Sequence, residues 1–387
     1  MPQGDYERLE CVGKGNQGSV YRARHFVTGQ IFVLKRAELD AEDDTLRQAA
    51  LKEAELLGSL VHACVVRYHE SFAELDGERT YICIVMEFCA GGDLHKRVEH
   101  ASAVATKGLG PLPTGAPAGF FPESQVLLWF VQISLALHHV HVRRLLHRDL
   151  KTQNIFIGEE GFLKLGDFGI ARVLEGPSKL ARTMVGTPYY MSPELFRNIP
   201  YGFASDVWAL GCVLYELLCL RHAFDGKSFN GLAANILKGK YLPIPAHYSR
   251  GIRTLVGEML AREPDKRPPV SNILSRPFLR KHIAAFATAA LTTDATSAPK
   301  VRPPPSPPQE LALPNSQPDS TERGRAALRS QLLSAGLEKL VSRIDAQNAP
   351  ATENKNNGNN GYGGGGANGP GGGGGGEGGG PRGGGGE

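Results

Sequence analysis

The chain has 387 residues, which is enough for two or three domains with a sizeable buried core and excludes a small stapled module. Its 43 basic and 39 acidic residues give a net charge of only +4, too balanced for a dedicated nucleic-acid-binding protein. The longest apolar run, 207–220, is shorter than the ~18 residues of a membrane span and contains Glu216. We therefore expect neither nucleic acid nor a membrane as a direct partner.

The six cysteines form no CxxC pair, so we expect no zinc site. The N-terminus has no apolar signal region, so we expect a cytoplasmic or nuclear chain.

The first part of the chain predicts a small β-rich lobe with one helix. Apolar and polar residues alternate from 6 to 35, and the spacing becomes helical over 41–61. Two further strands are predicted at 64–72 and 80–88. The second is a continuous apolar run, which is typical of a strand buried on both faces.

The next part of the chain predicts mainly helices. Apolar residues surround most of 123–145 and 205–220, which indicates two core helices. Residues 102–121 are rich in Ala, Gly and Pro without periodicity, so we expect a long mobile surface loop there. The folded domain is expected to end near residues 282–290.

The C-terminal part predicts a linker, a helix and a disordered tail. Residues 291–320 form a proline-rich linker, and residues 321–346 regain helical spacing. The repeat covers under three heptads, so a lone or domain-docking helix is at least as good an interpretation as a coiled-coil dimer. Residues 347–387 are rich in Asn and Gly, with 20 of the 48 glycines after residue 350, which predicts disorder. Four apolar residues have the spacing of a coiled-coil seam: Leu333, Leu337, Leu340 and Ile344.

A glycine-rich segment joins the first two predicted strands. Gly13, Gly15, Gly18 and Val20 give the pattern G-x-G-x-x-G-x-V, and glycine lets backbone N–H groups approach phosphate oxygens. Alone the pattern is weak, because many glycine-rich hairpins are only turns. A dinucleotide-binding fold would need a helix directly after the loop, where this sequence has a strand.

Lys35 ends the apolar strand IFVLK, fifteen residues after Val20. Burial of a lysine is costly unless it meets an anion, and Glu53 on the following helix is a candidate partner. For this segment in isolation, an edge lysine whose ammonium group reaches solvent is the better interpretation.

Two polar motifs follow the long helix. Residues 147–154 read HRDLKTQN, and DFG lies at 167–169 after two short strands. Asp149 can accept a hydroxyl proton, while Asn154 and Asp167 carry oxygen ligands suited to Mg²⁺. The ordered series of glycine loop, strand lysine, helix glutamate, HRDxxxxN, DFG and Pro-Glu at 193–194 is the signature set of protein kinases.

The sequence from about Tyr6 to Leu279 resembles the eukaryotic protein kinases. The resemblance implies an α+β bilobal fold within 6–282: a five-stranded N-lobe with helix C at about 6–88, and a mainly helical C-lobe at about 89–282. HRDLKTQN and GTPYYMSPE are similar to the serine/threonine class. HRDLKTQNIF, LGDFGIARVL and LARTMVGTPYYMSPE are similar to the NIMA-related kinases, a family linked to mitosis, centrosomes and cilia.

This resemblance implies transfer of the ATP γ-phosphate to Ser or Thr hydroxyls of proteins. Lys35 would contact the α- and β-phosphates, with Glu53 as its ion-pair partner. Asp149 would act as the base, and Lys151 would contact the γ-phosphate. A catalytically silent kinase-fold scaffold is the alternative, because fold alone does not fix function. Such chains commonly lack the strand lysine or one of the motif aspartates, and this sequence retains all of them.

The cofactors implied by the resemblance are ATP and Mg²⁺. Asn154 and Asp167 would bind the metal, and Val20, Val33 and Phe156 would enclose the adenine. The full implied set for the nucleotide is Val12, Gly13, Lys14, Gly15, Gly18, Val20, Val33, Lys35, Met86, Glu87, Cys89, Asp93, Phe156 and Asp167.

The resemblance also implies structural and regulatory residues. Glu194 would pair with Arg267. Thr183 would carry an activating phosphate beside Arg148 and Arg172, and the alternative is an unmodified loop hydroxyl that faces solvent. A regulatory stack above Asp206 would contain Leu57, Tyr68, His147 and Phe168.

Overall fold

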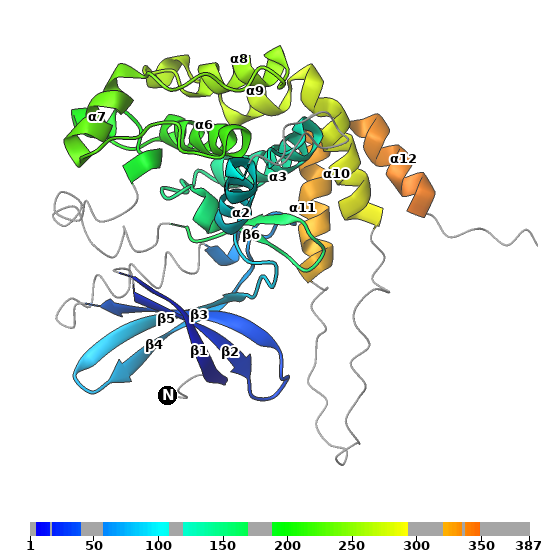
Figure 1. Cartoon of the computed structure of the whole chain (residues 1–387). Helices are drawn as coiled ribbons and strands as arrows, with labels where there is room; N and C mark the ends of the chain where they lie inside the picture. Colours follow the sequence, from blue (N-terminus) through cyan, green and yellow to red (C-terminus); the bar gives the residue numbers. More distant parts are fainter. Residues whose placement is uncertain are drawn as a thin grey trace, which may run out of the picture. The chain divides into compact units, whose positions relative to one another are not determined.

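The computed structural model consists of a small β-rich lobe and a larger helical lobe, which confirms the expected bilobal α+β architecture (Figure 1). The structure describes residues 5–15, 18–39, 57–107, 119–168, 188–292, 320–334 and 337–348. Most of the predicted proline-rich linker, almost all of the predicted disordered tail and most of the predicted helix at 41–61 lie outside these ranges.

The small lobe is one antiparallel sheet of five strands in the order β1-β2-β3-β5-β4. Ile82 and Ile84 of β5 pack into the main core, whereas Cys83 and Val85 pack into a second cluster with Phe32. This alternation explains the continuous apolar run, because both faces of the strand are covered. The strand predicted to begin at residue 64 begins at Tyr68 instead. The strands are β1 Tyr6–Gly15, β2 Gly18–His25, β3 Ile31–Leu39, β4 Tyr68–Asp76 and β5 Arg79–Glu87.

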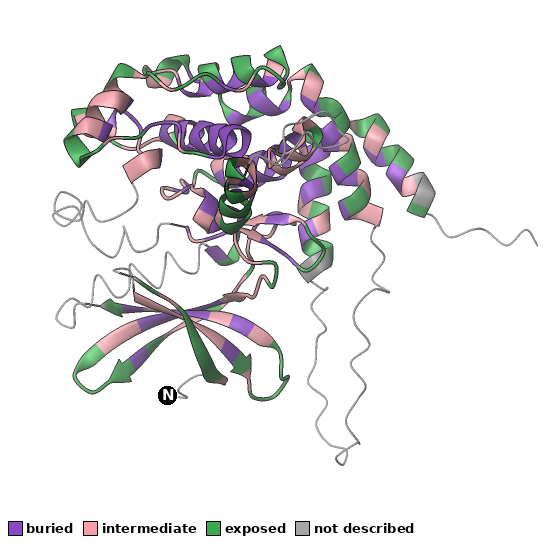
Figure 2. Cartoon of the chain, viewed as in Figure 1, coloured by how far each residue is buried: buried purple, intermediate pink, exposed green. Residues whose placement is uncertain are grey.

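The large lobe is built around two apolar helices, α3 and α6, as the sequence predicts. Nearly every residue of α6 is buried, and Figure 2 shows it as a purple helix inside the lobe. Helix α3 is long and apolar enough to cross a membrane by length and composition, but 67% of that window is buried among other parts of the protein. The helices are α2 Leu94–Thr106, α3 Glu123–Val142, α6 Phe203–Cys219, α7 Phe229–Lys238, α8 Arg250–Met259, α9 Val270–Leu274 and α10 Arg280–Thr292. A short hairpin of β6 Ile155–Ile157 and β7 Leu163–Leu165 lies between α3 and α6 in the sequence.

The prediction of a surface loop over 102–121 is wrong for residues 102–106, which form the last turn of α2. Asp93 caps the N-terminus of α2 by accepting a hydrogen bond from the Lys96 amide, at 2.9 Å. Leu94, Val98 and Ala101 then face the core at helical spacing. The helix continues to Thr106 because the alanine-rich sequence contains no Gly or Pro before residue 108. Residues 108–118 of the predicted loop lie outside the described residues.

The single helix predicted at 321–346 is two helices, α11 Ser320–Ser334 and α12 Glu338–Asn348. The sequence between them contains Gly336, and glycine is unfavourable inside a helix. Both helices pack beside α10 in the same compact unit as the rest of the described chain (Figure 1). The predicted seam is also wrong at one position, because Leu333 is 40% exposed. The fully buried leucines of α11 are Leu328 and Leu332.

Candidate active site

The HRD segment is held by the carboxylate of Asp206, which lies in the first turn of α6 and is fully buried. The backbone N–H groups of His147 and Arg148 donate to its two oxygens, at 2.9 and 3.1 Å. Burial tends to raise the pKa of Asp206, but hydrogen bonds from His141 and Tyr201 outweigh it, so the pKa is lowered. The ionised carboxylate therefore fixes the backbone immediately before Asp149.

His147 links the HRD and DFG motifs. Its Nδ1 accepts a hydrogen bond from the Asp149 amide at 3.3 Å, so the ring proton lies on Nε2, which donates to the Gly166 carbonyl at 3.0 Å. Burial lowers the pKa of His147, which favours this neutral form. The ring also lies 4.8 Å from the Phe168 ring, centroid to centroid. One side chain thus sets the spacing between the two motifs.

Asp149 lies in a small polar cluster of the large lobe, with Lys151 and Asn154. Its Oδ2 accepts from Lys151 Nζ at 2.7 Å and from Asn154 Nδ2 at 2.9 Å. The Asn154 amide also donates to the Asp149 carbonyl at 2.8 Å. Asp149 is still 21% exposed at its side chain, so an incoming hydroxyl can reach it.

Asp167 has a left-handed backbone, with a φ of 52°, which is unusual for a residue with a side chain. Its Oδ1 accepts from Lys35 Nζ at 2.7 Å. The Gly166 amide donates to the Asn154 carbonyl at 3.0 Å, so Asn154 and Asp167 lie at the same end of the β6–β7 hairpin. The Asn154 amide nitrogen donates to Asp149, and these bonds leave its Oδ1 as an oxygen ligand at that end of the hairpin. Two oxygen donors of this kind fit a hard divalent cation.

The β1–β2 hairpin carries the glycine-rich pattern. Gly18 has a φ of 111°, and a Cβ there would lie 2.0 Å from the Arg36 carbonyl oxygen, so this position requires glycine. Val20 lies opposite Lys35 in the β2–β3 register, which places both on the same stretch of sheet. The other predicted residues of the hairpin are near the end of β1: Val12, Gly13, Lys14 and Gly15.

The end of β5 supplies the predicted contacts for the adenine. Met86 lies opposite Val33 in the β3–β5 register, so these two predicted residues are neighbours. Glu87 follows Met86 and forms an ion pair with Lys164 of β7, at 2.8 Å. Cys89 lies two residues later in the connection to the large lobe, and burial raises the pKa of its thiol to about 12. Burial therefore disfavours the thiolate, which is the nucleophilic form.

Two more predicted residues meet beneath this connection. Asp93 forms an isolated β-bridge with Phe156 of β6, and its carboxylate is engaged in the cap of α2. A Cβ on Gly166 would lie 3.1 Å from the Phe156 ring and 2.7 Å from Val66, so this glycine permits close packing below the ring. Glu53, Thr183 and Arg172 lie outside the described residues.

A buried ion pair supports the lower part of the site. Arg267 forms two parallel hydrogen bonds of 2.8 Å to Glu194, and both side chains are almost completely buried. Burial tends to raise the pKa of Glu194, but the bonds from Arg267 and Ser205 outweigh it and lower the pKa. The pairing that the resemblance implied is therefore present.

Comparison with known proteins agrees with this geometry. The protein kinase domain family matches residues 6–279. Mouse serine/threonine-protein kinase Nek4 is 44% identical over 295 residues, which is 76% of this chain and 35% of that protein. Mouse Nek1 is 43% identical over 289 residues, 75% of this chain and 22% of Nek1, and human Nek5 is 40% identical over 284 residues, 73% of this chain and 37% of Nek5.

The chain belongs to the NIMA-related serine/threonine protein kinases. This finding confirms the family that the sequence motifs indicated. The matched segments span only about a fifth to two fifths of these three relatives' own length. Protein kinases in general use ATP and Mg²⁺, in agreement with the cofactors that the motifs implied.

The sequence analysis of this NIMA-related kinase did not identify Glu216 of α6, a buried carboxylate next to the catalytic segment. Its carboxylate is 2% exposed and accepts hydrogen bonds from Tyr190 and from Thr152, which directly follows Lys151. It also lies 3.6 Å from His95 Nδ1, and the hydrogen bond to Glu216 raises the pKa of His95. The sequence signal was the one acidic residue among the apolar residues 207–219 of α6.

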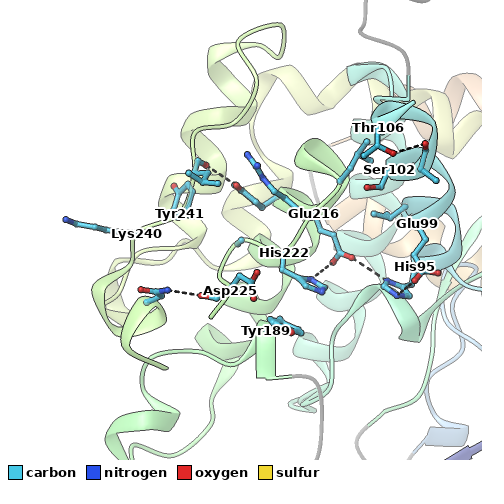
Figure 3. Close-up of a pocket in the computed structure, with 18 residues that line it drawn as sticks. His95, Glu99, Ser102, Thr106, Tyr189, Glu216, His222, Asp225, Lys240 and Tyr241 are labelled. Carbon is cyan, nitrogen blue, oxygen red and sulfur yellow. Dashed lines mark hydrogen bonds and ion pairs between the residues drawn. The ribbon is translucent and has the colours of Figure 1, made fainter. Parts of the chain in front are cut away.

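Glu216 lies at a cavity of about 860 Å³ between α2, α6 and residues 220–242 (Figure 3). In that view the His95 and His222 rings approach the carboxylate from two sides. The carboxylate therefore already has several partners within the protein and connects the catalytic segment to the cavity wall.

Proposed function

We propose that this protein transfers the γ-phosphate of Mg-ATP to Ser and Thr hydroxyls of other proteins. One observation carries the proposal: the Lys35–Asp167 pair joins the two lobes at 2.7 Å, in a chain whose Asp149 is oriented by Lys151 and Asn154. Phosphoryl transfer depends mainly on positioning and on charge neutralisation, and these are the groups that supply both.

Asp149 is the proposed base and orienting group for the substrate hydroxyl. Its carboxylate accepts two hydrogen bonds, which fix its direction, and it stays partly exposed for the hydroxyl to approach. Lys35 orients the α- and β-phosphates, with Glu53 as its second partner, and Lys151 stabilises charge on the γ-phosphate.

Asn154 and Asp167 are the proposed Mg²⁺ ligands. Both present oxygen atoms at one end of the β6–β7 hairpin, and that donor chemistry suits a hard cation. A bound Mg²⁺ would neutralise charge on the β- and γ-phosphates. The left-handed turn at Asp167 directs its carboxylate to the same site as the Lys35 ammonium group.

The nucleotide is proposed to lie between the sheet and the β6–β7 hairpin. Val20 and Val33 would cover the adenine from the sheet, and Phe156 would cover it from below. The backbone of Glu87 and Cys89 would bind the adenine edge, and Gly18 keeps the β1–β2 hairpin free of a side chain that would clash with β3.

A phosphate on Thr183 is the proposed activating switch, with Arg148 and Arg172 as its partners. A phosphoryl group brings about −1.5 to −2 charge and strong acceptor oxygens, which form charge-assisted bonds with guanidinium groups. We also propose a cytoplasmic location that extends to the nucleus or to the cytoskeleton, centrosome or cilium, on the basis of family membership alone.

The test is Mg-ATP turnover on a generic substrate such as casein by the wild type and by Asp149→Asn. The variant is expected to lose at least about 10²-fold in kcat while ATP affinity and thermal stability change little. Asp265→Asn, an exposed aspartate in the large lobe, is the matched control and should behave like the wild type. A wild type without turnover would favour the silent scaffold, and a fully active Asp149→Asn would refute the assigned base.

A further inference from the structure

Gln331 of α11 is a buried amide that contacts two separate parts of the kinase domain. The residue is 8% exposed. Its Oε1 lies 3.0 Å from His62 Nε2, in the segment before β4. Its Nε2 lies 3.0 Å from the Leu135 carbonyl and 2.9 Å from His138 Nδ1, both on α3. A polar side chain so placed is unusual at a helix interface unless all its hydrogen bonds are satisfied.

The hydrogen bonds of this amide have only one consistent direction. His62 Nδ1 accepts from the Cys64 amide at 3.0 Å, so the ring proton lies on Nε2 and is donated to Gln331 Oε1. The Gln331 NH₂ group then donates one proton to Leu135 O and one to His138 Nδ1. Every polar atom of the amide is used, and its orientation is fixed.

Apolar side chains also bury α11, and its Gly324 lies against the same segment. Leu328 and Leu332 are completely buried, and a Cβ on Gly324 would lie 3.4 Å from the Ala63 amide nitrogen. Val341 and Ile344 of α12 are also buried. Helix α11 therefore lies directly against His62 and Ala63, and Gln331 is the hydrogen-bonding group within that contact.

Residues 62–66 are bonded directly to the strand that leads into DFG. The Leu165 amide donates to the Cys64 carbonyl at 2.8 Å, and the Val66 amide donates to the Leu165 carbonyl at 2.9 Å. Leu165 lies two residues before Asp167, whose carboxylate binds Lys35. A series of hydrogen bonds thus runs from Gln331 through His62 and Cys64 to Leu165, and the chain continues from there over two residues to the proposed metal ligand.

We propose that Gln331 is a positioning residue for phosphoryl transfer: by holding residues 62–66 against α3, it fixes β7 and so the position of Asp167. The inference rests on the proposed kinase activity. It makes α11 and α12 an integral part of the catalytic domain, although a long segment separates them from α10 in the sequence. Loss of the amide would leave His62, His138 and the Leu135 carbonyl without this partner in a buried place, where unpaired polar groups are costly.

The test compares full-length Gln331→Met with full-length Leu333→Gln. Methionine keeps the length of the side chain but makes no such hydrogen bonds, and Leu333 is an exposed control on the same helix. Gln331→Met is expected to lower kcat about tenfold or more, with less than about a twofold change in KM for the protein substrate. Its amide hydrogen exchange should rise about tenfold or more at residues 64–66 and 165 and stay unchanged in α8. Leu333→Gln should match the wild type in all three measurements.

Wild-type exchange at residues 64–66 and 165 in Gln331→Met would overturn the proposal, as would raised exchange with an unchanged kcat. If Gln331→Met does not fold, Gln331→Asn, which keeps the amide but shortens its reach, carries the same test with a smaller expected effect. A wild type without phosphoryl transfer would refute the proposed function, while the exchange data would still test whether Gln331 holds residues 62–66 and β7 in place.

Discussion

The ammonium group of Lys35 lies 2.7 Å from the carboxylate of Asp167, although 132 positions separate the two residues in the chain. The Lys35 side chain is only 10% exposed, so it is not the solvent-reaching edge lysine that its own segment suggested. A buried ammonium group requires an anion, and the DFG aspartate supplies one in this structure. The pair is the shortest polar link described between the sheet of the small lobe and the motifs of the large lobe.

Lys35→Met should therefore remove activity without unfolding the protein. We expect kcat to fall by about 10²- to 10³-fold, the usual effect of losing one positioned charge from a transition state. The loss of stability should be small, because Asp167 is 31% exposed and can be solvated when its partner is removed. Steady-state kinetics and a thermal melt measure the two effects. Lys266→Met, at a side chain that is 67% exposed, is the control, and an active Lys35→Met enzyme would contradict the assignment.

The buried pair of Glu194 and Arg267 predicts a large effect on stability instead. Glu194→Gln would leave the Arg267 guanidinium buried without a counter-charge, which typically destabilises a protein by about 3–5 kcal/mol. Urea denaturation measures this change. The control is Glu258→Gln, which breaks a partly exposed pair with Arg276 and should change the free energy of unfolding by at most about 1 kcal/mol. Equal effects of the two variants would show that burial of the first pair does not matter.

Two buried histidines predict that the protein loses stability in mild acid. Burial lowers the pKa of His62 to about 3 and of His139 to about 4, below the ordinary value of 6.5. The unfolded chain therefore binds more protons than the folded chain below pH 6.5, and the free energy of unfolding falls as the pH falls. Each histidine contributes up to about 1.4 kcal/mol per pH unit.

Urea denaturation at pH 7.0 and 5.5 measures this dependence. The free energy of unfolding should be lower at pH 5.5, and His62→Gln should make the dependence on pH shallower by roughly one proton. Equal stability of the wild type at the two pH values would mean that these rings accept protons in the folded state.

The proposed switch at Thr183 predicts that activity depends on phosphorylation. Thr183→Ala should lower activity strongly, because the phosphate charge that is proposed to order the segment between DFG and Pro193-Glu194 would be lost. Arg148→Ala should remove most of the effect of phosphorylation, since Arg148 is a proposed partner of the phosphate. Kinase assays before and after phosphatase treatment measure both effects. Full activity in the dephosphorylated wild type would exclude the switch.

The fold and the catalytic motifs could be predicted because they depend on local sequence. The alternating strands of the small lobe and the apolar helices α3 and α6 have strong periodicity, and HRD and DFG lie at fixed spacing. Glycine positions were equally informative, because the positive φ at Gly18 leaves little choice of residue.

The parts that could not be predicted depend on contacts between distant segments. Residues 102–106 of α2 were assigned to a loop because their alanines have little periodicity of their own; they continue the helix that begins after the cap at Asp93. The prediction that Leu333 lies in a buried seam was wrong, because heptad spacing alone does not show which face of α11 packs on the kinase domain. The buried leucines of that face are Leu328 and Leu332. Gln331 and Glu216 gave almost no sequence signal, since a polar residue in a helix is informative only once its buried partners are known.

The most direct test of the central proposal is transfer of label from γ-labelled ATP to a protein substrate, followed by identification of the modified residues. Wild-type enzyme with Mg²⁺ should place the label on serine and threonine, and Asp149→Asn should place almost none. Label found only on tyrosine, or ATP consumption without any labelled protein, would contradict the account.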